Sequence, residues 1–137
     1  MTALITYLMP IETAARELDY KLAIAARLKA PHRQFLLFRP DLADVFIRLV
    51  HAGIWVGQNI RARTPHGDDY TRYRALKDAA CAVAYIDEEG GIYPGDEDSW
   101  EQVIRQRLDP TVLAEDDLLV GWGSFQASVW KRSPTSV

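Results

Sequence analysis

The chain has 137 residues, of which 48% are hydrophobic and 26% are charged, and its formal net charge is −3. This composition is typical of a folded globular domain and excludes a disordered chain or a disulfide scaffold, because Cys81 is the only cysteine. The sixteen lysines and arginines are scattered among nineteen acidic residues, which argues against a nucleic-acid partner. We expect one domain over residues 1–132 and a disordered tail at 133–137.

The N-terminal segment predicts a buried strand followed by a helix. Residues 3–9 are almost all apolar and end at Pro10, as in a strand buried on both faces of a parallel sheet. Thr13 is placed to cap the helix that follows. The apolar stripe of that helix is expected to consist of Ala14, Leu18, Leu22, Ala25 and Leu28.

The rest of the chain alternates between short apolar strands and amphipathic helices. Strands are predicted at residues 34–38, 54–56, 81–86 and 118–120. A helix that starts at Pro40 is expected to bury Leu42, Val45, Phe46 and Leu49. Further helices are predicted over 70–80, from near 98 to 108, and around Phe125 and Val129. This alternation predicts a Rossmann-like three-layer α/β/α domain with a mostly parallel sheet.

Two loops that follow predicted strands carry the candidate functional residues, because ligands of open parallel sheets bind beyond the carboxyl ends of the strands. The first loop holds Glu12, with Arg16 and Glu17 in the helix behind it. The second follows the most apolar strand and reads Asp87-Glu88-Glu89-Gly90-Gly91. Adjacent carboxylates repel one another, and partial burial would raise the pKa of at least one toward the range of a general base. Gly90 and Gly91 would permit a sharp turn or a close approach to a ligand.

Each of these features also has a purely structural interpretation. The acidic run can be a solvated turn, and Arg16 and Glu17 can be helix-surface charges. In the functional interpretation Arg16 faces the cleft and either holds a substrate anion or positions Glu88. Trp122 can be a core residue or a platform for a sugar ring. The three histidines have no metal-ligand neighbours at suitable spacing, so neither a metal nor a cofactor is predicted.

Three segments, taken together, resemble a group of surface carbohydrate biosynthesis proteins. They are PIE at 10–12 with RELDYKL at 16–22, then IDEEGGIY at 86–93, and finally GWGSFQA at 121–127. Members of that group look like GT-B glycosyltransferases. Their acidic pair followed by glycine is similar to one in bacterial sialyltransferases and polysialyltransferases, in which the first acid is the general base toward the acceptor hydroxyl. The resemblance implies that Glu88 is the base and Glu89 its partner, while Asp87 leaves the register open and stays an alternative base.

The resemblance also implies a division of labour between two domains. This chain would be the acceptor-binding half of a nucleotide-sugar-dependent glycosyltransferase for bacterial surface polysaccharide, and its partner would be a glycan or glycolipid acceptor. Such enzymes hold the donor in a second Rossmann-like domain with a His-Pro motif, and no His-Pro dipeptide occurs here. We therefore expect no activity of this chain alone, donor binding only through a missing C-terminal domain, and association with a further copy or a partner chain.

The N-terminus lacks the positive start of a signal peptide, so the expected location is the cytoplasm, either free or peripheral at the inner membrane. A non-catalytic Rossmann-like binding or assembly module is the alternative function. A receiver domain fits poorly, because Glu12 stands alone after the first strand and Gln58 follows the third. A dinucleotide oxidoreductase is also disfavoured, since residues 10–13 contain no glycine.

Overall fold

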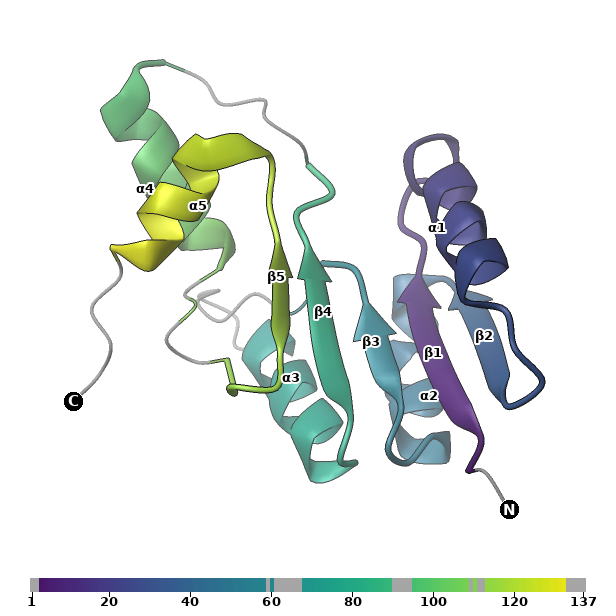
Figure 1. Ribbon diagram of the computed structural model, residues 1–137. Coiled ribbons are helices and arrows are strands. Elements are labelled where there is room, and N and C mark those ends of the chain that lie inside the picture. The colour runs from purple at the N-terminus through teal and green to yellow at the C-terminus, as the bar shows by residue number, and fades with distance from the viewer. Residues whose placement is uncertain are drawn as a thin grey trace.

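The computed structural model describes residues 3–58, 60, 68–89, 95–108, 110 and 113–132, with the side chains of 68–70 left out. Strands and helices alternate along the whole of this part of the chain (Figure 1). The strands are β1 (Ile5–Pro10), β2 (Arg33–Phe38), β3 (Ile54–Val56), β4 (Ala82–Ile86) and β5 (Leu118–Val120). The helices are α1 (Ala14–Leu28), the 3-10 turn η1 (Pro40–Leu42), α2 (Ala43–Leu49), α3 (Asp68–Asp78), α4 (Glu97–Arg107) and α5 (Gly123–Lys131).

The described strands form one sheet in the order β2-β1-β3-β4-β5, and every pairing in it is parallel. This confirms the predicted Rossmann-like α/β fold. This is the strand order of flavodoxin-like doubly wound sheets. In such sheets the order of the strands reverses between β1 and β3, and ligands bind at that point. β4 is an interior strand, as its unbroken apolar sequence predicts, and its carboxyl end lies close to those of β1 and β3 (Figure 1).

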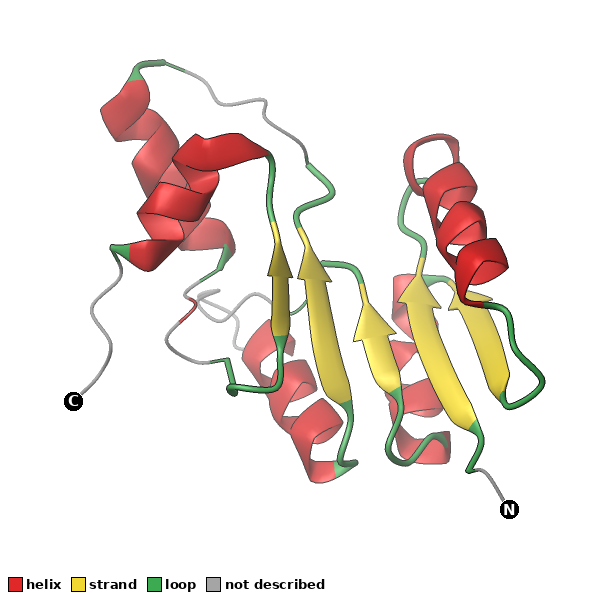
Figure 2. Cartoon of the chain, viewed as in Figure 1, coloured by secondary structure: helices red, strands yellow, loops and turns green. Residues whose placement is uncertain are grey.

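The two faces of the sheet are covered unequally. Residues of α2, α3, α4 and α5 share one core cluster with Leu8, Trp55, Val83 and Tyr85 of the strands. On the opposite face Ile24 and Leu28 of α1 pack against Tyr7, Met9 and Val56. α1 alone among the described helices covers that face, over its β1 side (Figure 2). The same face of β5 is therefore open, and Leu118 and Val120 are 59% and 41% exposed there.

The predicted buried stripe of α1 is wrong at Ala14 and Leu22, whereas Leu28 packs against the core and Leu18 and Ala25 are partly buried. Leu22 is 48% exposed and Ala14 is exposed, whereas Glu17 and Lys21 are buried, with Ile24 and Leu28 continuing the same face. Residues 17, 21, 24 and 28 have the i, i+4, i+7, i+11 spacing of one helix face. The apolar pattern missed this face because its first two turns lie beyond the carboxyl end of β1 and pack on polar loop groups instead of the sheet.

The predicted face of α2 is also wrong. Leu42, Val45 and Leu49 are 44%, 45% and 75% exposed, and Phe46 is only partly buried. The helix instead buries Ala43 and Ile47, with Val50 following them. The small side chain of Ala43 lets the helix approach the sheet closely, so α2 buries the face with Ala43 and Ile47 and exposes the face with more leucine.

None of the helices in the described ranges is long and apolar enough to cross a membrane.

Gly53, which precedes β3, packs closely against β1 and Val50. A Cβ atom added at Gly53 would lie 2.7 Å from Val50 Cγ1 and 2.8 Å from the carbonyl oxygen of Thr6 in β1. We expect Gly53→Ala to lower the free energy of unfolding by about 1–3 kcal/mol, because the strand must shift to make room. Urea denaturation of the two proteins measures this difference.

The adjacent residue supplies a matched control for that measurement. Ala52 has a φ of 55°, in the left-handed region that glycine adopts without strain. Ala52→Gly should therefore leave the free energy of unfolding unchanged or raise it by up to about 1 kcal/mol. Equal destabilisation by both substitutions would show that the turn, and not the contact with β1, sets the cost.

Candidate functional site

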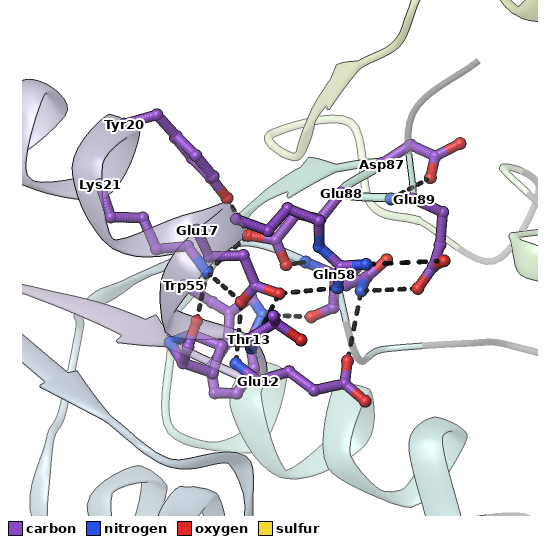
Figure 3. Close-up of polar contacts among 12 residues, drawn as sticks. Glu12, Thr13, Glu17, Tyr20, Lys21, Trp55, Gln58, Asp87, Glu88 and Glu89 are labelled. Carbon is purple, nitrogen blue, oxygen red and sulfur yellow. Dashed lines mark hydrogen bonds and ion pairs between the residues drawn. The ribbon is translucent and has the colours of Figure 1, made fainter. Parts of the chain in front are cut away.

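The carboxyl ends of β1, β3 and β4 meet at one place, and the polar residues that follow these strands gather there with the first turns of α1 (Figure 3). Glu12 follows β1, Gln58 follows β3, and the acidic run Asp87 to Glu89 follows β4. Several of these side chains are buried although they carry charge, which requires that each be paired or hydrogen-bonded. The contacts show how this is achieved.

Glu17 ties the start of α1 to the loop after β1. Its buried carboxylate accepts hydrogen bonds from the backbone N–H groups of Glu12 (2.8 Å) and Thr13 (3.2 Å) and from the Arg16 guanidinium (2.8 Å). Thr13 occupies the N-cap position but its side chain makes no capping bond, so that expected role is not seen. Glu17 instead reaches back from the first turn to the backbone N–H groups at and before the cap. Burial acts to raise the pKa of Glu17, but the bonds from Arg16 and Glu12 outweigh it and lower the pKa.

Lys21 lies one turn further along α1 and is fully buried. Its ammonium group donates to the carbonyl oxygen of Pro10, lies 3.5 Å from Glu17 and lies 2.5 Å from Oε1 of Glu88. Burial lowers the pKa of Lys21 to about 8, against the opposing effect of Glu17. Lys21 therefore joins α1, the end of β1 and the end of β4 through a single charged group.

Glu88 is a buried carboxylate of the acidic run that contacts α1. Its side chain is 1% exposed. It accepts hydrogen bonds from the hydroxyl group of Tyr20, from Lys21 and from the backbone N–H of Gln58 (3.2 Å). Burial raises the pKa of Glu88 to about 8, while the bond from Gln58 opposes the rise. The sequence prediction that one acid of the run would have a raised pKa thus has a physical cause at Glu88.

Gly57 closes the back of the Lys21–Glu88 pair. Its φ is +142°, a conformation that side chains rarely adopt, and an added Cβ would lie 3.3 Å from Lys21 Nζ and 3.4 Å from Glu88 Oε2. The absence of a side chain at Gly57 therefore leaves room for the two charged groups, and a larger residue would crowd them.

Gln58 connects the outer carboxylates of the site. Its side-chain amide donates to Glu12 (3.4 Å) and to Glu89 (3.4 Å), and its backbone carbonyl oxygen accepts from the indole N–H of Trp55 (3.1 Å). The Arg16 guanidinium lies 3.8 Å from Glu89. Glu89 is partly exposed, so it forms the rim of the site whereas Glu88 forms its buried part.

Asp87 points away from this cluster (Figure 3). Its buried carboxylate accepts hydrogen bonds from Arg107 of α4 (3.3 and 3.4 Å) and from the side-chain amide of Gln126 in α5. Its carbonyl oxygen accepts from the indole N–H of Trp122. Asp87 therefore anchors α4 and α5 to the end of β4, and its oxygens are occupied by structural contacts.

A pocket of about 580 Å³ opens between α1 and β5, beside the Glu88 cluster. Its lining includes Arg16, Tyr20, Ile24, Ile86, Asp87, Glu88, Val120, Gly121 and Trp122. Trp122 is 57% exposed, and the bond from its indole to Asp87 holds the ring in place. The pocket thus combines an apolar floor and one aromatic wall with a polar corner at Tyr20 and Glu88, within the 300–1,000 Å³ typical of small-ligand sites.

The structure brings together most of the residues singled out from the sequence. Glu12, Arg16, Glu17, Glu88 and Glu89 share one connected network, and Asp87 and Trp122 stand on the other side of the pocket. Arg16 contacts Glu17 and Glu89. Gly90 and Gly91 lie outside the described residues. No three His, Cys, Asp or Glu side chains are grouped for metal binding in the ranges that the structure describes.

The sequence interpretation missed Tyr20, Lys21, Gln58 and Gln126 as parts of this site. One signal was present, because Glu17 and Lys21 are spaced i, i+4 and share a face with Ile24 and Leu28. A helix face that is charged in its first turns and apolar in its last ones indicates that the first turns lie beyond the end of the sheet. Gln58 and Gln126 give no such signal, because the burial of a single glutamine does not show in the apolar pattern of the sequence.

The network predicts that Glu17 is important for stability. Replacing Glu17 with Gln removes the charge that balances Arg16 and Lys21 and leaves the backbone donors of Glu12 and Thr13 poorly paired. We expect the free energy of unfolding to fall by about 3–5 kcal/mol, the usual cost of breaking a buried ion pair. Urea denaturation measures it, and the exposed Glu115→Gln is the matched control, expected within about 0.5 kcal/mol of the wild type. Similar values for the two variants would contradict the buried network.

Glu88 predicts a distinctive dependence of stability on pH. Its pKa is raised from the ordinary 4.5 to about 8. Between these pH values the unfolded chain is ionised at Glu88 while the folded chain keeps the proton, so stability from this group is complete below the lower value and is lost as the pH rises toward the upper one. The free energy of unfolding of the wild type, minus that of Glu88→Gln, should therefore fall between about pH 5 and pH 8. Chemical denaturation at several pH values checks this, and a difference that rises with pH would refute the raised pKa.

Comparison of the chain with models of known protein families, with curated proteins and with solved structures finds no match. The fold is therefore established by the structure itself. The structure shows the contacts of the site. The resemblance to surface carbohydrate biosynthesis proteins stays a prediction from the three sequence segments.

Proposed function

We propose that this chain is the acceptor-binding half of a nucleotide-sugar-dependent glycosyltransferase of bacterial surface polysaccharide synthesis, with Glu88 as its general base. One observation carries the proposal. Glu88 is a buried carboxylate at the carboxyl end of an interior strand, its pKa is raised to about 8, and it lines a pocket with an exposed tryptophan wall. The resemblance of the acidic run to the glycosyltransferase motif supports the same residue.

The raised pKa suits the chemistry of glycosyl transfer. An acceptor hydroxyl forms a bond to the anomeric carbon of the donor with an oxygen lone pair, its proton moves to the base, and the nucleotide leaves with the electron pair of the broken glycosidic bond. A general base is most effective when its pKa lies near the working pH. Burial raises the pKa of Glu88 to about 8 and so brings a carboxylate into this range.

The pocket suits a sugar acceptor. A pyranose ring has an apolar face that packs on an aromatic side chain and a rim of hydroxyl groups that need hydrogen-bonding partners. Trp122 offers such a face with its indole N–H already engaged by Asp87, and Tyr20 and Arg16 provide polar groups opposite. We place the acceptor between Trp122 and Tyr20, with the reacting hydroxyl directed toward Glu88.

The contacts favour Glu88 over the alternative base Asp87. Both side chains are buried, but the Asp87 carboxylate accepts from Arg107 and Gln126, groups that hold α4 and α5 in place. Glu89 stands on the exposed rim near Arg16, and we assign it the role of orienting the acceptor.

We assign the nucleotide-sugar donor to a second Rossmann-like domain or a partner chain, because the sequence contains no His-Pro dipeptide of the kind found in the donor domains it resembles. The exposed Trp122 and Val120 beside the pocket suit this arrangement. The Trp122 side chain is 57% exposed beside the pocket, which leaves room for a second domain or chain to pack over it.

A non-catalytic binding module is the second candidate. It is favoured by one feature, the three hydrogen bonds that Glu88 receives while its side chain is only 1% exposed. In that case the charged cluster would serve only to hold α1 against the sheet, and the pocket would bind a carbohydrate without reaction. Replacement of Glu88 separates the two candidates.

The test is a Glu88→Gln substitution in the full reading frame of the native host, which keeps the shape of the side chain and removes the proton acceptor. We expect a rate of glycosyl transfer lower by about 10²–10⁴-fold and a corresponding loss of surface polysaccharide, measured by carbohydrate staining of cell extracts. Glu115→Gln, an exposed glutamate away from the pocket, should match the wild type.

The two possible failures have different meanings. If Glu88→Gln left the polysaccharide intact while Asp87→Asn abolished it in a folded protein, Asp87 would be the base. If neither substitution changed the polysaccharide, the binding-module function would replace the enzyme.

A further inference from the structure

Lys21 is a buried charged side chain for which no role in catalysis was predicted. It is fully buried, lies 2.5 Å from the Glu88 carboxylate, and is held there by the Pro10 carbonyl oxygen and by Glu17 at 3.5 Å. A lysine is almost never fully buried without a partner, because transfer of its charge out of water is costly. The ammonium group of Lys21 therefore contacts the proposed base and not the solvent.

We propose that Lys21 is a positioning residue that keeps the buried Glu88 carboxylate able to give up its proton near neutral pH, and so able to act as a base. The inference rests on the proposed function of Glu88 and names the group that prepares it. Lys21 itself is not a catalytic residue, because its side chain is fully buried behind Glu88.

The physical reason is the balance between burial and charge. Burial favours the neutral carboxylic acid, and a carboxyl group that stays protonated cannot accept the proton of an acceptor hydroxyl. A positive charge in direct contact with Oε1 favours the carboxylate instead. Gly57 leaves room for the contact, because a Cβ atom added there would lie 3.3 Å from Lys21 Nζ and 3.4 Å from Glu88 Oε2. Without Lys21 only the backbone N–H of Gln58 and the more distant Arg16 would oppose the effect of burial.

The other charges near Glu88 cannot replace Lys21. Glu17 and Glu12 raise the proton affinity of Glu88 further, and Arg16 lowers it from a distance. The titratable and charged groups that face the pair from the packed elements are Glu12 in the β1–α1 loop, Arg16, Glu17 and Tyr20 on α1, and Glu89 on its own loop. Among the described residues, Lys21 is the cation in contact with the Glu88 carboxylate.

The experiment measures the proton affinities of the pair in this chain, without donor or acceptor. Glutamate carboxyl carbons are labelled with carbon-13 and titrated by NMR in the wild type, with Glu88→Gln used to assign the Glu88 signal. In Lys21→Gln we expect the pKa of Glu88 to rise by about 1–3 pH units, the effect of losing an opposite charge within contact distance. The control is Lys131→Gln, an exposed lysine at the end of α5, which should leave the pKa of Glu88 unchanged.

A reciprocal measurement protects the test against a variant that fails to fold. Coupling between two sites is equal in both directions, so Glu88→Gln should lower the pKa of Lys21, observed by nitrogen-15 NMR of its ammonium group, by the same amount. An unchanged pKa of Glu88 in folded Lys21→Gln, or an unchanged pKa of Lys21 in Glu88→Gln, overturns the inference.

The outcomes also distinguish this inference from the proposed function. If the two pKa values are coupled but Glu88→Gln leaves the surface polysaccharide intact, the pair is real and the enzyme assignment fails. If the polysaccharide is lost but the pKa values are independent, the enzyme assignment stands and Lys21 serves only to hold α1 in place.

Discussion

The buried contact between Lys21 of α1 and Glu88 at the end of β4 is the interaction on which the site depends. It closes a network that runs from the loop after β1 through Glu17 to Gln58 after β3. A buried ion pair adds little net stability compared with apolar residues of the same volume, but removing one partner is strongly destabilising. We therefore propose that the pair is kept for its position and charge, in line with the proposed function of Glu88.

The opposite wall of the pocket depends on a second buried carboxylate. Asp87 holds Arg107 of α4, Gln126 of α5 and the indole of Trp122, so the two neighbouring acids Asp87 and Glu88 face opposite walls. Consecutive residues at a strand end point to opposite sides, which explains how one acidic run can serve both. Among the helices that the structure describes, α1 alone covers this face of the sheet, and the pocket lies between the two walls.

Local apolar runs were sufficient to predict the strands, and the structure has β3 and β5 at the predicted residues. The helix faces were harder, since Leu22 and Leu49 attract any apolar count yet are exposed, while the charged Glu17 and Lys21 are buried. The sequence pointed to the acidic run because carboxylates cluster there. Its partners Tyr20 and Gln58 are distant in sequence and meet Glu88 only through the parallel order of β1, β3 and β4, which periodicity does not encode.

The proton affinity of Glu88 in the wild-type chain is the property on which the enzyme assignment rests. Its carboxyl pKa, measured by carbon-13 NMR titration of the folded protein, tests it most directly. We expect a value near 8, because burial disfavours the charged carboxylate. A value at the ordinary 4.5 of a solvated glutamate would contradict it, because the acidic run would then be a charged turn without a base.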